Sequence, residues 1–85
     1  MHVLMVEITA PSAEEAERIG RTLVEERLAA CVNLLGGIHS IYRWQGAVEE
    51  ADEVAMIAKT TATRFAALDR RVRELHGYDV PCVVT

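Results

Sequence analysis

Apolar residues are grouped along this chain in runs of two different periods. Residues 3–8 form a short, almost continuously apolar run of strand-forming types, which is typical of a strand in the middle of a sheet. Residues 54–58 are apolar on both faces and indicate a second covered strand, and residues 82–85 indicate a last short one. Between these strands the spacing of apolar residues changes.

After residues 9–11 the apolar residues recur at the spacing of a helix. They are Ala16, Ile19, Gly20, Leu23, Val24 and Leu28. Ser12 and Glu15 form a capping-box pattern, in which a hydroxyl and a carboxylate each satisfy a free backbone N–H at the start of a helix. Two pairs of opposite charge stand four residues apart in the favourable orientation: Glu14 with Arg18, and Glu17 with Arg21. This segment is predicted to be the first helix.

A second helical stretch begins after residues 59–61, where a threonine is expected to cap it. One face is marked by Phe65, Leu68, Val72 and Leu75. His76 and Gly77 are expected to end this helix, with the glycine in the left-handed conformation that favours it.

Residues 28–46 predict one long strand with a bend at Gly36 and Gly37. Its tail alternates: Ser40, Tyr42 and Trp44 face one way, and Ile41 and Arg43 the other. Gly46 permits a turn, after which the chain returns through residues 54–59. The acidic residues 47–52 are expected to form the wet end of this hairpin or an exposed edge.

The order strand, helix, strand, strand, helix, strand predicts a ferredoxin-like α+β sandwich (βαββαβ), with an antiparallel sheet and both helices on one face. The 85 residues make a single domain, 1–85. Nothing in the chain is left to cover the other face of the sheet. We therefore expect a homo-oligomer, in which a partner subunit covers it.

Composition excludes several classes of function. A net charge of −4 argues against nucleic acid as a partner. The two cysteines do not form a disulfide framework, and no run has the length of a signal peptide or a membrane span. We expect a cytoplasmic protein with no membrane partner. No phosphate-binding glycine loop, GxSxG motif or serine near a histidine is present, so the sequence indicates no enzyme.

The candidate ligands each have a functional and a structural interpretation. Cys31 as a thiolate suits a soft ion such as Cu(I), yet a free cysteine is more often a small buried apolar residue. Lys59 stands at an exposed strand end or lines a cleft between subunits. His39 is expected to face solvent or a neighbouring strand, and His76 to interact with the helix end; the two are too dispersed for a metal motif.

Two further groups of side chains also have both a functional and a structural interpretation. Interface packing is the better interpretation of the aromatic set Tyr42, Trp44 and Tyr78. An acidic cluster is formed by Glu49, Glu50, Asp52 and Glu53. These acids would hold a hard cation weakly, or simply keep the tip of the hairpin soluble.

Four ordered motifs resemble the CutA divalent-cation-tolerance family. They are Leu28-Ala29-Ala30-Cys31-Val32-Asn33, Ser40-Ile41-Tyr42-Arg43-Trp44-Gln45-Gly46, Lys59-Thr60-Thr61 and Leu75-His76-Gly77-Tyr78-Asp79-Val80-Pro81. The resemblance implies a cytoplasmic homotrimer, similar in assembly to the PII signalling proteins and linked to metal tolerance. It also implies binding of copper or other divalent metal ions. Our candidate metal ligands are Cys31, His76 and Cys82, with a strand-core residue as the alternative interpretation of Cys82. Lys59 and Tyr78 are the further candidate residues of the binding site.

The chain departs from the family pattern at three positions and at its end. Gly36 and Gly77 stand where the family usually has proline, and Cys82 stands where it has an acid. The family pattern continues beyond Thr85, so its C-terminal segment is expected to be absent here. The alternative function is an oligomeric signalling scaffold that binds a small effector or a protein partner, with metal binding incidental.

Overall fold

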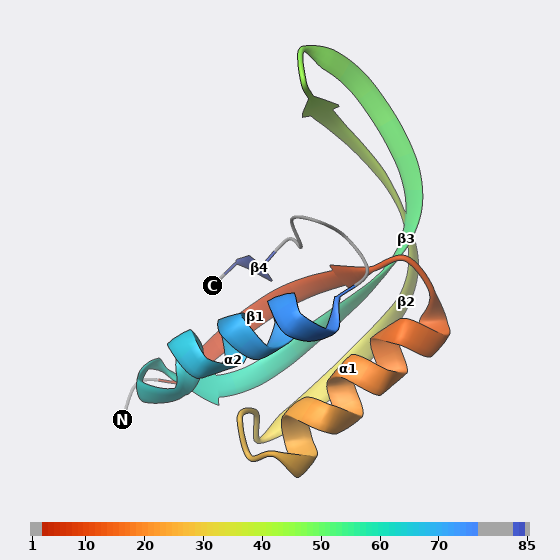
Figure 1. The fold of residues 1–85 in the computed structure, drawn as a ribbon. Helices are drawn as coiled ribbons and strands as arrows, with labels where there is room; N and C mark the ends of the chain where they lie inside the picture. Colours follow the sequence, from red (N-terminus) through yellow and green to blue (C-terminus); the bar gives the residue numbers. More distant parts are fainter. Residues whose placement is uncertain (1–2, 77–82, 85) are drawn as a thin grey trace.

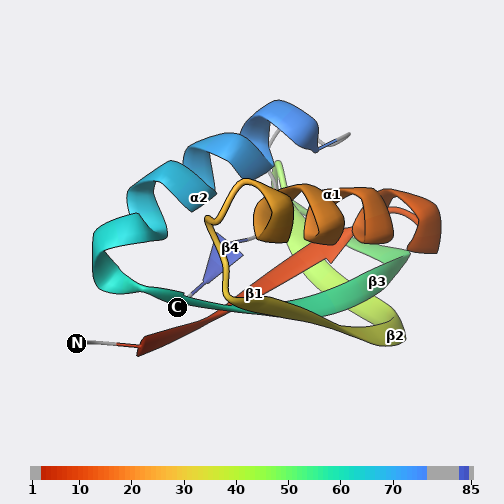
Figure 2. The same cartoon turned by 90° about the horizontal axis from the view of Figure 1, so that it is seen from below.

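The computed structural model describes residues 3–76 and 83–84 of the chain. The elements are β1 (Val3–Ala10), α1 (Ala13–Glu25), β2 (Cys31–Trp44), β3 (Ala47–Thr61), α2 (Ala62–Leu75) and β4 (Val83–Val84). The sheet has the order β2-β3-β1-β4, and every neighbouring pair of strands is antiparallel. Both helices lie on one face of it, as Figure 2 shows from below. The predicted ferredoxin-like α+β fold is confirmed.

The core lies between the helices and one face of the sheet. In β1 the residues facing the helices are buried, and the register places Val6 opposite Ala58 and Ile8 opposite Met56. The helices contribute Ile19, Leu23, Leu68 and Val72, which are all fully buried. The strand period of two and the helix period of 3.6 therefore meet in one apolar layer.

Helix α1 begins as the sequence predicted. Ser12 is its N-cap, and the Ser12 hydroxyl accepts a hydrogen bond of 3.1 Å from the backbone N–H of Glu15. The helix ends at Glu25, earlier than predicted, because Arg27 turns into the left-handed region with φ 62°. Leu28 lies beyond the helix but still packs against the core.

The ion pairs on α1 follow the prediction only in part. Arg21 contacts Glu17 at 2.9 Å, as expected. Arg18 contacts Glu15, which stands three residues earlier in the helix, at 3.5 Å. The sequence had predicted Glu14 as its partner. The Arg21–Glu17 pair is exposed, and Glu15 of the other pair is partly buried. Pairs of this kind at the surface stabilise a helix weakly.

Gly20 allows α1 to approach the sheet closely. A Cβ atom at this position would lie 3.1 Å from Cγ1 of Val32 on β2. The missing side chain therefore fixes the spacing between this helix and the strand that leads into the long hairpin.

The β2–β3 hairpin carries the predicted irregularities. The register shifts between Leu34 and Gly36, and Gly36 has φ 106°, a conformation that proline cannot adopt. Gln45 and Gly46 both have positive φ, which is typical of the tight turn that joins twisted antiparallel strands. Residues 47–52 belong to β3 and are exposed, so they are the wet end of the hairpin. Residues 38–53, the arm, project beyond the helices (Figure 1).

The start of α2 differs from the expectation. Thr61 occupies the N-cap position, but its side chain makes no capping hydrogen bond, so the predicted threonine cap is wrong. The buried Thr60 instead donates its hydroxyl to the carbonyl of Leu28 at 2.6 Å, which ties the end of β3 to the turn after α1. At the other end, α2 stops at Leu75 with His76 as C-cap, and Gly77 lies outside the described residues.

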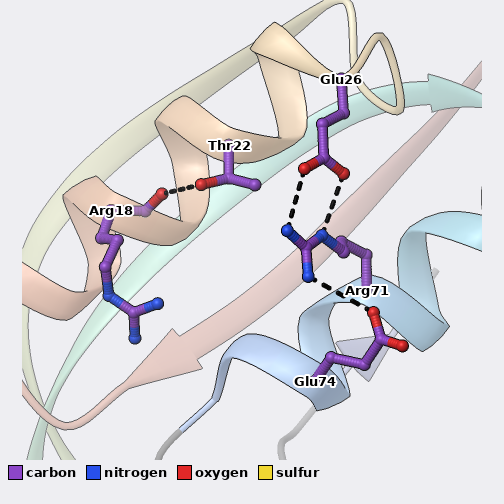
Figure 3. A network of polar contacts seen from close by, with 5 residues as sticks. All are labelled: Arg18, Thr22, Glu26, Arg71 and Glu74. Atoms are coloured by element: carbon purple, nitrogen blue, oxygen red, sulfur yellow. Dashed lines mark hydrogen bonds and ion pairs between the residues drawn. The ribbon is translucent and has the colours of Figure 1, made fainter.

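Polar contacts connect the two helices on their outer side (Figure 3). Arg71 of α2 donates two hydrogen bonds of 2.9 Å to the two carboxylate oxygens of Glu26, and it also contacts Glu74 at 3.4 Å. The hydrogen bond from Arg71 lowers the pKa of Glu26. Arg18 of α1 donates to the carbonyl of Leu75 at 2.8 Å. Neither helix among the described residues is long and apolar enough to cross a membrane.

Leu68→Ala tests the core between α2 and the sheet. Leu68 is fully buried, so truncation leaves a cavity and lowers the free energy of unfolding by about 2–5 kcal/mol. Denaturant unfolding at fixed protein concentration measures this change. Thr63→Ala, on the exposed side of the same helix, is the control and changes stability by less than about 0.5 kcal/mol. Equal stabilities of the two variants would contradict the assigned core.

Candidate metal site

The register of the sheet places Cys31, Lys59 and Met5 in one row across three strands. Cys31 of β2 and Met5 of β1 are each paired directly with Lys59 of β3. Directly opposed residues of antiparallel strands share a face, and this is the face without helices. The row therefore combines a thiol, a thioether and an ammonium group on the open face of the sheet.

Cys31 is partly accessible within the single chain. It is a free thiol of intermediate exposure at the first residue of β2, so it does not belong to the buried core that its residue type favoured. The backbone N–H of Ala30 donates to the carbonyl of Lys59 at 2.8 Å, which extends the pairing of the two strands by one residue. The thiol and the ammonium group are thereby held on neighbouring strands. A cysteine thiolate is the form that binds soft metal ions.

His76 lies at the other end of the sheet. Its Nε2 donates a hydrogen bond of 2.5 Å to the carbonyl of Thr9, because a carbonyl oxygen can only accept. Thr9 lies four residues beyond Met5 along β1, which is about 13 Å at the rise of a strand. Within one chain, His76 and Cys31 do not face the same ion. His76 binds a metal through Nε2 only if it gives up the bond to Thr9.

Tyr78 and Cys82, the two other predicted site residues, lie outside the described residues. Across residues 3–76, no group of three or more histidine, cysteine, aspartate or glutamate side chains is arranged to hold a metal ion. Of the predicted site residues, the structure brings Cys31 and Lys59 together. Met5 was missed, because its position beside Lys59 depends on the register of two strands 54 residues apart in the chain.

His39 forms a second polar cluster, on the arm. Its Nδ1 lies 2.8 Å from Asp52 and its Nε2 lies 2.7 Å from Glu50. Carboxylates only accept, so both bonds together require the doubly protonated ring. The hydrogen bond to Asp52, and next the one to Glu50, raise the pKa of His39 above the ordinary 6.5. The expectation that His39 faces solvent and a neighbouring strand is confirmed.

The acids of the arm are divided between the two faces of β3. Asp52 and Glu50 share the face of His39, whereas Glu49 is paired with Tyr42 and Glu53 with Ile38 on the other face. The four acids therefore do not converge on one cation. Their exposure is consistent with the interpretation that they keep the hairpin soluble.

The fold and the four motifs lead to the same group of proteins. The CutA1 divalent ion tolerance protein family matches residues 4–85. This chain belongs to that family. The resemblance deduced from residues 28–33, 40–46, 59–61 and 75–81 is thereby confirmed.

Relatives of this CutA1 family member come from several branches of life. The divalent-cation tolerance protein CutA of Thermus thermophilus is 54% identical over 80 residues, which cover 94% of this chain and 78% of that protein. The protein of the same name from Archaeoglobus fulgidus is 50% identical over 76 residues, covering 89% and 74%. Human protein CutA is 47% identical over 77 residues, covering 91% of this chain but only 43% of the human protein.

Solved structures of CutA1 proteins have the same fold. The Thermus thermophilus structure superposes with a TM-score of 0.94 at 52% identity, covering 96% of this chain and 80% of that one. CutA1 from Oryza sativa gives a TM-score of 0.92 at 39% identity, covering 96% and 75%. The arrangement of β2, β3 and β1 that carries the row of Cys31, Lys59 and Met5 is therefore the architecture of the family.

The titration of His39 tests the cluster on the arm. Its pKa is expected above 6.5, and Asp52→Asn is expected to lower it, because the largest contribution to the shift comes from Asp52. The raised pKa means that the cluster stabilises the fold fully below the unfolded value, and that this contribution is lost as the pH rises through the folded value.

NMR titration of the imidazole signals, assigned with a His39→Gln variant, measures this pKa. Glu49→Gln removes the same charge from the opposite face of β3 and is expected to leave the pKa of His39 almost unchanged. A pKa at or below 6.5 in the unmodified chain would show that the two carboxylates do not hold the ring.

Proposed function

We propose that this chain forms a homotrimer that binds copper or another divalent or soft metal ion and serves in metal tolerance. The observation that carries the proposal is the row of Cys31, Lys59 and Met5 on the open face of the sheet, in a chain of the divalent ion tolerance family. Relatives from Thermus thermophilus and Archaeoglobus fulgidus bear the name divalent-cation tolerance protein.

The exposed apolar surface supports assembly. On the open face Val3 and Met5 are 67% and 60% exposed. The hairpin adds Leu34, Leu35, Ile38, Ile41, Tyr42, Trp44 and Val48 to the large exposed apolar residues. A monomer would leave this surface in water, and the projecting arm would be a two-stranded ribbon with little of its own to stabilise it. Packing against two further copies would remove the apolar surface from water and would stabilise the arm.

The chemistry of the row supports a soft ion. A thiolate and a thioether are the donors that select Cu(I), and Cys31 and Met5 stand on either side of Lys59 in the row. The described residues of one chain supply fewer donors than a closed site needs, so assembly would complete the coordination. His76, Cys82 and Tyr78 keep their predicted roles as contributors from this chain or from a neighbouring copy.

As part of the same proposal, the protein is not an enzyme and acts in the cytoplasm. The described residues present no nucleophile with a base in hydrogen-bond reach, and a free Cys31 thiol suits a reducing compartment. The name of a solved CutA structure from Archaeoglobus fulgidus includes the word periplasmic, and the name of a relative from Arabidopsis thaliana includes the word chloroplastic. Fractionation of the source cells tests the compartment.

The alternative function is an oligomeric signalling scaffold in which metal binding is incidental. It is favoured by the lack of a cluster of three potential ligands anywhere in residues 3–76. In that case metal binding would be weak, unselective and unchanged by substitution of Cys31.

Trp44→Ala tests the assembly. Light scattering of the metal-free chain is expected to give three times the 9.4 kDa of the monomer. Trp44 is 47% exposed near the turn of the arm and is expected to anchor an interface, so its loss should raise the dissociation constant roughly thirtyfold. Arg43→Ala, on the opposite face of the same strand, is the control. A monomer at every concentration would refute the trimer.

Cys31→Ser tests the metal site separately from the assembly. Competition with a chromogenic Cu(I) chelator is expected to show binding weakened by roughly tenfold or more, with the mass in solution unchanged. Met5→Leu should weaken Cu(I) binding less, because a thioether carries no charge. His39→Gln, on the arm, serves as the control. Unchanged Cu(I) affinity in Cys31→Ser would remove the thiol from the site and favour the scaffold.

A further inference from the structure

A groove of about 510 Å³ opens at one end of the domain, where four segments meet. They are the start of β1, the end of α1 with the turn after it, the end of β3 and the first turn of α2. Three positively charged side chains line it: Arg27, Lys59 and Arg64. No acidic residue is among its lining residues. This is a concentration of positive charge in a chain whose net charge is −4.

None of these three cations has an ion-pair partner among the described residues. Arg64 donates a hydrogen bond from Nη1 to the backbone carbonyl of Arg27, which uses one of its five N–H donors and holds the guanidinium at the groove. Gathering like charges without counter-charges costs free energy that a bound anion recovers. By contrast, Arg18, Arg21, Arg71 and Arg73 all contact acids.

The start of α2 adds to the positive potential of the groove. Thr61 makes no side-chain cap, and the first turn contains no acidic residue. The first backbone N–H groups of a helix have no partner within the helix and carry its positive dipole end. A cation in this turn is unfavourable for the helix itself, so helix stability does not explain Arg64. An anion in the groove would accept hydrogen bonds from both the backbone and Arg64.

Apart from Thr60 and Thr61, the rest of the groove is apolar. Val3, Val24 and Ala29 line it beside the cations, and the first two are exposed. The volume lies in the range of small-molecule sites. We propose that this groove binds a small organic phosphate, with the phosphate on Arg27, Arg64 and the start of α2 and an apolar body against Val24 and Ala29.

The proposed phosphate site goes beyond metal tolerance and is separable from it. The groove is built by one chain, whereas the metal site needs assembly. Lys59 takes part in both, because it also stands in the row with Cys31 and Met5. The test therefore leaves Lys59 unchanged and uses the chain in the presence of a chelator, so that failure of metal binding and failure of phosphate binding are observed independently.

Isothermal titration calorimetry with phenyl phosphate tests the proposal. Arg64→Gln and Arg27→Asn are each expected to weaken binding about tenfold, the value of one charge-assisted hydrogen bond. Asparagine is chosen at position 27 because it tolerates the left-handed conformation found there. Arg70→Gln, an exposed arginine of the same helix without a described partner, is the matched control and should bind as the unmodified chain does.

Further ligands distinguish the parts of the proposal. Phenyl phosphate is expected to bind more tightly than inorganic phosphate, and phenol not to bind. Amide NMR shifts of residues 62–64 on addition of phenyl phosphate should report contact with the start of α2, without the need for a variant. Equal weakening by Arg70→Gln would show diffuse attraction and overturn the site, as would binding of phenol. Equal affinity for phenyl and inorganic phosphate would overturn the apolar contact.

Discussion

The pairing of β3 with strands on both of its sides positions almost every feature of this domain. Through β1 and β2 it sets which residues face the helices and which face away. It also aligns Cys31 and Met5 with Lys59, and His39 with Asp52. Because side chains alternate between faces, a shift of one residue in this register would move each of these groups to the opposite face. The bulge at Gly36 accommodates the bend without losing the alignment on either side.

The two faces of the sheet have different consequences. One face is closed by α1 and α2 over a dry core, and the bond between Arg71 and Glu26 joins the helices at its outer side. The other face and the arm present apolar side chains to water. A domain of this size gains limited stability from its own core, so an assembly that covers the open face is consistent with both its stability and its proposed function.

Charge is distributed along the long axis of the molecule. Four acidic residues lie on the arm, where His39 is held between two of them, and three cations without an ion-pair partner among the described residues line the groove at the far end of β3. The proposed metal row borders the groove through Lys59. The two proposed sites are thus neighbours that share one lysine.

Features that depend on neighbours in the chain were predictable from the sequence. The two periods of apolar residues determined the order of the elements and hence the fold, and Ser12, Gly36 and Gly46 determined the helix cap, the bulge and the turn, because each acts through its own backbone. The family followed from short contiguous motifs. Three local predictions differ from the structure. Helix α1 ends at Glu25, before Leu28, and Arg18 pairs with Glu15 in place of Glu14. Thr61 stands at the N-cap of α2 but makes no capping hydrogen bond with its side chain.

Features that depend on register and packing were decided only by the tertiary structure. The row of Cys31, Lys59 and Met5 joins three strands, and the two carboxylates around His39 come from the opposite side of a hairpin. The contact of Arg71 with Glu26 joins residues 45 apart in the chain. No local pattern in the sequence predicts these contacts, because they depend on the pairing of the strands and on the packing of the helices against the sheet. For the same reason the groove, built from four separate segments, could not be predicted from the sequence.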